Sequence, residues 1–103
     1  MMLRLIVRVI GTEEDSGVES TLAIVESNQY TPDHLDAMVN LVLTNALEAL
    51  KSTSLDSLCS WRPEVSVTLT ADDEVVRPSL HLTQGTLHRL SEAGASFDFD
   101  PYV

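Results

Sequence analysis

The sequence predicts one α+β domain over residues 1–103, with a mainly antiparallel sheet in the order ββαββαβ and the long helix packed on one face. Three observations lead to this prediction. A chain of 103 residues has room for one hydrophobic core, and its hydrophobic content of 44% is too high for a disordered chain. Segments of alternating apolar and polar residues flank a segment with helical periodicity. The expected strands come mostly in pairs, which favours α+β over a parallel, doubly wound sheet.

The first two strands are expected to form a hairpin. In Leu3–Ile10 one set of alternate residues is wholly apolar and the other includes Arg4 and Arg8, as in a strand covered mainly on one side. The polar segment Gly11–Gly17 carries three consecutive acids and is typical of a turn. Val18–Ser27 is then expected to pair back onto the first strand.

A long helix is predicted from Pro32 to about Leu50. Thr31 is a good N-cap, and Pro32 suits the first helical position because its missing N–H would have no partner there. The apolar residues recur at spacings of three and four and predict the buried face: Leu35, Met38, Val39, Val42, Ala46, Leu47 and Leu50. The polar residues are expected to face away: Asp36, Asn40, Thr44, Glu48 and Lys51.

The remaining elements are a short helical turn, three strands and a short helix. The helical turn is expected around Leu55–Cys59, before Trp61, and strands are expected over residues 64–70 and 76–82. Because proline donates no ladder hydrogen bond, the second of these is expected to lie at an edge or to bulge at Pro78. Thr83 is expected to cap the short helix, whose apolar stripe is Leu87, Leu90 and Ala93 and which ends at Gly94. Phe97 and Phe99 alternate with polar residues in a final strand.

The C-terminal segments carry a resemblance to a known family. Their order is an edge strand (Ser79–Leu82), a short helix (Leu87–Leu90), Gly94-Ala95, a strand of alternating Phe and Asp (Phe97–Asp100) and Tyr102. This order resembles a family of small bacterial domains known only as a domain of unknown function. The resemblance implies a fold and implies no catalytic residue.

The charge balance bears on the partners of the protein. Sixteen acids against six bases give a net charge of −10, which disfavours nucleic acid and anionic membranes and favours basic surfaces. The alternative, that the acids only confer solubility, remains open. The single Cys59 forms no internal disulfide and no segment is apolar enough to span a membrane, so we expect a cytoplasmic protein.

Two acidic clusters and one tryptophan are the candidate partner-binding residues. The clusters lie in two expected turns and would form one negative rim if the hairpins pack side by side. Trp61 is the only tryptophan, so it serves either as an interface anchor or as a cap on the core under the long helix. The candidates are Glu13, Glu14, Asp15, Trp61, Asp72, Asp73 and Glu74.

No motif for catalysis or for a cofactor is present, and we expect no catalytic residue, no cofactor and no metal. Asp98 and Asp100 project from one side of a strand and, with His81 and His88, are the only candidates for a metal cluster; a solvated outer face is the other interpretation. Two further residues are expected to be inert, with Cys59 a small buried hydrophobe and His34 neutral and exposed.

The sequence therefore favours a non-enzymatic, acidic interaction protein that occupies a basic partner surface. An immunity protein or a phage-type inhibitor fits this description. The alternative is a structural or housekeeping module, for example a homodimer that pairs through an exposed strand edge. A third interpretation is a small metal-dependent hydrolase that uses Asp98 and Asp100.

Overall fold

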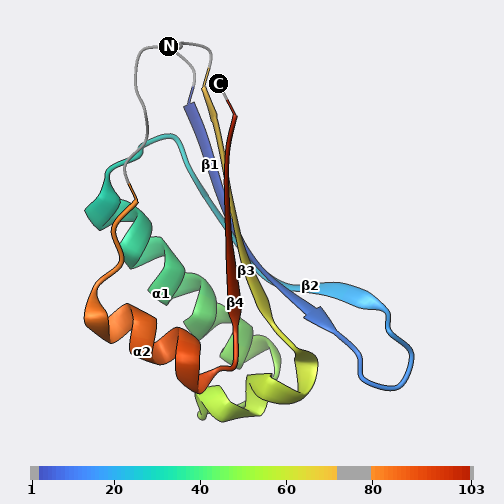
Figure 1. Cartoon of the computed structure of the whole chain (residues 1–103). Coiled ribbons are helices and arrows are strands. Elements are labelled where there is room, and N and C mark those ends of the chain that lie inside the picture. Colours follow the sequence, from blue (N-terminus) through green and yellow to red (C-terminus); the bar gives the residue numbers. More distant parts are fainter. Residues whose placement is uncertain (1–2, 72–79, 103) are drawn as a thin grey trace.

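The computed structural model describes residues 3–71 and 80–102, which form a mixed four-stranded sheet with helices against one face (Figure 1). The α+β class is therefore confirmed. The strand order is β2-β1-β3-β4. Along the chain the elements are β1 (Leu3–Thr12), β2 (Glu19–Ser27), α1 (Pro32–Ala49), the 3-10 helix η1 (Leu55–Trp61), β3 (Glu64–Ala71), α2 (Gln84–Glu92) and β4 (Ser96–Tyr102).

The predicted hairpin is confirmed, and β1 is the strand around which the sheet is built. It pairs with both β2 and β3 in antiparallel fashion. Its residues Leu5, Val7 and Val9 are fully buried toward the helices, whereas the alternate residues are half-buried or exposed. The pairing with β2 shifts between Val9 and Ile10, so a bulge increases the local twist just before the turn.

The prediction of a mainly antiparallel sheet is wrong at β4, which pairs parallel to β3. Parallel neighbours require a crossover connection, and α2 lies within the connection between these two strands. The expected strand over residues 76–82 would have allowed an antiparallel return. Residues 76–79 lie outside the described residues, and 80–82 form no strand.

The long helix α1 begins at Pro32 as predicted and ends at Ala49. Its predicted face is buried apart from Leu50, which is half-buried, and Leu43 is buried without having been predicted. The Thr31 hydroxyl accepts a hydrogen bond from the N–H of His34 at 3.0 Å and caps the N-terminus. The apolar side chains of α1, which lies against β1 and β2, join residues of β1, β3, η1 and α2 in one core. This core comprises Leu5, Val7, Val9, Leu35, Met38, Val39, Val42, Leu43, Ala46, Leu47, Leu58, Val65, Val67, Leu69, Leu90 and Ala93.

The polar side of α1 was expected to face away from the protein, but part of it contacts α2. The Asn40 amide donates to the Thr86 hydroxyl at 2.7 Å, and Arg89 Nη1 donates to Asn40 Oδ1 at 2.6 Å. Thr86 is accordingly buried, whereas Leu87, which was predicted to belong to the apolar stripe, is 53% exposed. A polar helix face looks the same in a sequence whether water or a polar neighbour covers it.

Candidate functional site

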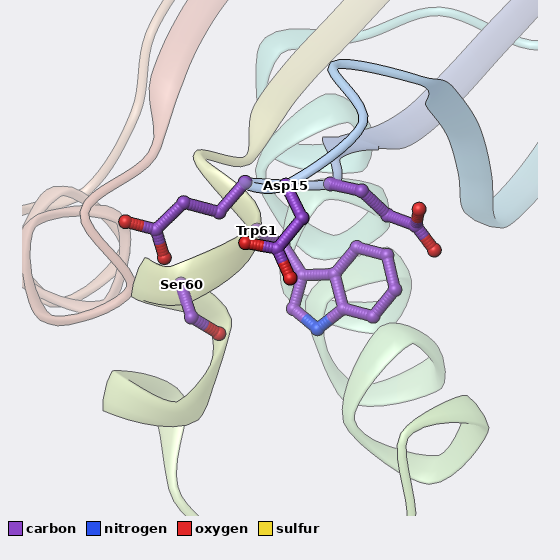
Figure 2. Close-up of a pocket in the computed structure, with 5 residues that line it drawn as sticks. Asp15, Ser60 and Trp61 are labelled. Carbon is purple, nitrogen blue, oxygen red and sulfur yellow. The ribbon is translucent and has the colours of Figure 1, made fainter.

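The described residues form an open pocket between the β1–β2 turn and the C-terminal end of η1 (Figure 2). Its volume is about 330 Å³. In Figure 2 the Asp15 side chain extends from the turn toward the Trp61 indole, with Ser60 beside them. The pocket is lined by Glu13, Glu14, Asp15, Ser60 and Trp61.

The acidic turn has a defined backbone shape. The N–H of Glu13 donates to the carbonyl of Val18 at 2.9 Å, and the N–H of Gly17 donates back to the carbonyl of Glu13 at 2.9 Å. Gly17 has a φ of +69°, a conformation that a residue with a Cβ rarely adopts. The Ser16 hydroxyl donates to the Glu13 carboxylate at 2.7 Å, so this side chain is oriented locally. The exposed Glu14 carboxylate forms no hydrogen bond with any described residue.

Trp61 approaches the end of β1 closely because the residue there, Gly11, has no side chain. A Cβ placed on Gly11 would lie 3.2 Å from Trp61 Cε3 and 2.9 Å from Leu22 Cδ1, so only a glycine permits this approach without a shift. Trp61 is the last residue of η1, and the chain turns sharply after it because Arg62 adopts a left-handed φ of +46°. The indole is therefore fixed beside the acidic turn.

Trp61 lines the pocket and does not cap the core under the long helix, whereas its role as an interface anchor stays a prediction. The indole is half-buried, and it is not among the described side chains that pack against the core beneath α1. It lines the pocket with Glu13, Glu14 and Asp15 instead. Of the pocket residues, sequence reasoning missed Ser60, which no pattern marks. It also treated Gly11 only as a turn residue, although this glycine seats the indole.

The arrangement of the pocket suits a cation. Three acidic residues line the pocket with the indole, and a guanidinium or ammonium group gains from contact with both an aromatic face and carboxylate oxygens. Within residues 3–71 and 80–102, no group of three or more His, Cys, Asp or Glu side chains is arranged to hold a metal ion. The pocket thus offers acidic side chains and part of an aromatic ring to a ligand.

The second acidic cluster, Asp72, Asp73 and Glu74, lies outside the described residues. The strand that leads into it, β3, ends at Ala71, which pairs with Leu3. Leu3 is at the opposite end of β1 from Thr12 and the acidic turn. The candidate site comprises the first cluster with Ser60 and Trp61.

The candidates for a metal cluster lie on different sides of the sheet. Asp98 and Asp100 share the register of Ser66 and Thr68 and lie on the face that the helices leave uncovered. His88 lies on α2, on the other face, where its Nε2 is 2.7 Å from a Glu92 carboxylate oxygen. The structure thus separates His88 from the two aspartates.

Two expectations about single residues are wrong. Cys59, expected to be buried, is exposed, because η1 lies at the edge of the core; its Sγ is 3.5 Å from the carbonyl oxygen of Glu92. His34, expected to be exposed, is half-buried, and its Nε2 is 2.9 Å from the Ser27 hydroxyl. Both side chains face a neighbouring element that their local sequence does not reveal.

No family model, curated protein or solved structure matches the chain. The resemblance of the C-terminal segments to a domain of unknown function therefore stays a prediction. None of the described helices combines the length and the hydropathy that crossing a membrane requires.

Proposed function

We propose that this protein is a non-enzymatic interaction protein that binds a basic surface of a partner protein and takes a cationic side chain of that partner into the Trp61 pocket. The observation that carries the proposal is the meeting of Glu13, Glu14 and Asp15 with Trp61 in one pocket. An immunity protein or a phage-type inhibitor would act in this way, by covering the basic surface with which its target works.

The carboxylates and the indole of the pocket are expected to contribute to binding in different ways. The carboxylates of Glu14 and Asp15 lie in an exposed turn, where each attracts a cation at a distance and contributes less than about 1 kcal/mol of binding energy in water. Trp61 is half-buried and fixed by Gly11, so it offers a rigid aromatic face at a small cost in side-chain entropy. Trp61 is therefore the expected anchor, and the carboxylates select for positive charge.

The only tryptophan of the chain provides a direct test. We expect an arginine-containing peptide to change the fluorescence of Trp61 in a saturable way, and a peptide with citrulline in place of arginine to have little effect. The triple variant Glu13→Gln, Glu14→Gln, Asp15→Asn should weaken binding at least about tenfold, since it removes all three carboxylates of the pocket.

A matched variant controls for net charge. Asp33→Asn, Glu48→Gln and Glu92→Gln remove the same amount of negative charge from the helices, away from the pocket. This control should keep the affinity for the arginine peptide within about threefold of that of the original protein at physiological salt, where distant exposed charges are screened. Equal losses in both triple variants, or equal binding of the citrulline peptide, would contradict a cation site at Trp61.

A further inference from the structure

The strand β4, drawn in dark red in Figure 1, forms one edge of the sheet. It pairs with β3 on one side, and within residues 3–71 and 80–102 no strand lies on its outer side. An edge strand presents backbone N–H and C=O groups that can pair with a further strand. A segment of another protein can bind in this way, with the backbone supplying affinity and alternate side chains supplying specificity.

The hydrogen bond at the start of β4 shows which of its backbone groups face outward. The N–H of Ser96 donates to the carbonyl of Pro63, just before β3, at 3.0 Å. Backbone groups point alternately to the two sides of a strand, so the even-numbered residues bond to β3 and the odd-numbered ones point outward. Pro101 agrees with this assignment, because proline is tolerated where its nitrogen faces away from the sheet. The outer edge thus presents an N–H and a C=O at both Phe97 and Phe99, and no described residue bonds to these groups.

The side chains of β4 differ between the two faces of the sheet. Phe97 and Phe99 lie on the helical side, where they are half-buried and pack against the core. The ring of Phe99 also stacks on Tyr30, with the ring centroids 6.4 Å apart. Asp98 and Asp100 lie on the face that the helices leave uncovered. A strand beside β4 would therefore place apolar residues next to the two phenylalanines and basic residues next to the two aspartates.

The other charges of the uncovered face do not oppose a basic strand. Glu64 of β3 shares this face with the two aspartates of β4. The basic residues on it are Arg4 and Arg8, both on β1, and Arg4 is paired with Glu26 at 3.0 Å. Neighbouring strands lie about 4.8 Å apart, so an added strand would be about 14 Å from β1 but only about 5 Å from β4. The nearest charges to the added strand are therefore acidic.

A second copy of this chain does not suit the edge. If two copies paired antiparallel through Phe97 and Phe99, Asp98 of one copy would face Asp98 of the other, and like charges directly opposite each other are destabilising. Two chains of net charge −10 also repel each other. We infer that β4 binds an extended segment of another protein, in which basic and apolar residues alternate, as a fifth strand of the sheet.

A peptide of alternating lysine and valine with blocked ends is the probe, and fluorescence anisotropy of the labelled peptide measures binding at physiological salt. A peptide of the same composition with its valines in one block should bind at least about tenfold more weakly, because its side chains cannot alternate between the two faces. The variant Glu13→Gln, Glu14→Gln, Asp15→Asn removes the carboxylates of the Trp61 pocket. It should keep the affinity for the alternating peptide within about threefold.

Charge reversal at the edge is the second test. Asp98→Lys should weaken binding of the alternating peptide at least about tenfold, because it sets a lysine against the lysines of the peptide. Glu48→Lys makes the same change of charge on α1 and should keep the affinity within about threefold, since distant exposed charges are screened. Circular dichroism establishes that both variants are folded.

Amide hydrogen exchange of the original protein, followed by NMR, identifies the edge directly. In the free protein the N–H groups of Phe97 and Phe99 should exchange faster than that of Asp98, which faces β3. Saturating peptide should slow exchange at the two phenylalanines at least about tenfold, with little effect on Asp98. Methyl groups on the peptide nitrogens that face β4 should abolish binding, whereas methyl groups on the alternate nitrogens should be tolerated.

Several outcomes would overturn the inference. These are no binding of the alternating peptide, equal binding of the block peptide, and binding that leaves the amides of Phe97 and Phe99 unprotected. A loss of binding in the triple pocket variant would assign the peptide to Trp61 and not to β4. The added strand does not depend on the cation site at Trp61, and either proposal can fail alone.

Discussion

At the scale of single residues, the two α-helices end in the same hydrogen-bonded motif with different residues. After α2, the N–H groups of Gly94 and Ala95 donate to the carbonyls of Ser91 and Leu90. After α1, Lys51 and Ser52 donate in the same way to Glu48 and Leu47. The motif requires a left-handed residue, which is Gly94 at a φ of +64° in one case and Lys51 at +54° in the other. Only the end marked by glycine could be predicted from the sequence.

Lys51→Gly is expected to raise the free energy of unfolding by about 1 kcal/mol, because glycine adopts the left-handed conformation without the steric cost that a Cβ imposes. Urea unfolding followed by circular dichroism measures the difference. Lys51→Ala is the control, since it removes the same charge but keeps the Cβ, and it should bring no such gain. Equal stabilisation by alanine and glycine would contradict this explanation.

Gly94→Ala should have the opposite effect, a loss of about 1–3 kcal/mol. The new Cβ would combine a left-handed φ of +64° with a contact of 3.1 Å to Cys59 Sγ. Cys59→Ala in the same chain should recover only the part of the loss that comes from this contact. Urea unfolding of the two single variants and the double variant separates the two causes.

At the scale of elements, local sequence signals predicted the bounds of helices and strands well, but they did not predict which distant elements lie side by side. The bounds of α1 were predictable because its cap, its proline and its apolar spacing all lie within the helix itself. The hairpin of β1 and β2 was predictable because one short turn joins the strands. The parallel pairing of β4 was missed, since alternation shows which side of a strand is buried but not which strand lies beside it. The contact between α1 and α2 was missed for the same reason.

The junction of α1 and α2 contains a carboxylate that links stability to pH. The N–H of Thr83 donates to Asp36 Oδ1 at 2.8 Å. Partial burial raises the pKa of Asp36, but the hydrogen bonds from the Thr83 backbone and from the Thr86 and Thr83 hydroxyls, with the charge of His81, outweigh it and leave the pKa below its usual value. A lowered folded-state pKa stabilises the fold above the unfolded-state pKa of about 3.9.

This contribution should disappear as the pH falls from about 5 through the lowered pKa of folded Asp36. Asp36→Asn keeps an oxygen for the Thr83 N–H but does not titrate, so its free energy of unfolding should fall less over the same range than that of the original protein. The difference should stay below about 1 kcal/mol because the site is near the surface. Asp33→Asn, on the same helix turn, is the control and should follow the original protein; identical pH profiles for all three would exclude a role for Asp36.

At the scale of the whole molecule, four of the five pocket residues were singled out from the sequence, but their meeting in one pocket was not predicted. The acids at 13–15 stood out as a charged turn, and Trp61 stood out as the only tryptophan. Their proximity depends on η1 returning the chain to the end of β1, and no local pattern encodes that return.

The net charge of −10 is a property of the whole molecule, and its electric field acts on a charged partner before the two proteins touch. A field of this sign accelerates encounter with a basic partner, and salt screens it beyond a Debye length of about 8 Å at physiological ionic strength. We therefore expect the association rate with an arginine-rich peptide to fall steeply as salt rises, while the dissociation rate changes little. Stopped-flow fluorescence of Trp61 over a salt series measures both rates.

The two triple variants distinguish the effect of net charge on binding from the effect of contacts within the pocket. Each variant removes three negative charges, but only one of the two sets of acids lines the pocket. Both should slow association at low salt, and the difference from the original protein should shrink as salt screens the field. Only the variant at Glu13, Glu14 and Asp15 should also speed dissociation, since only these carboxylates line the pocket. An association rate that responds neither to salt nor to either variant would mean that the acid excess serves solubility and does not guide a partner.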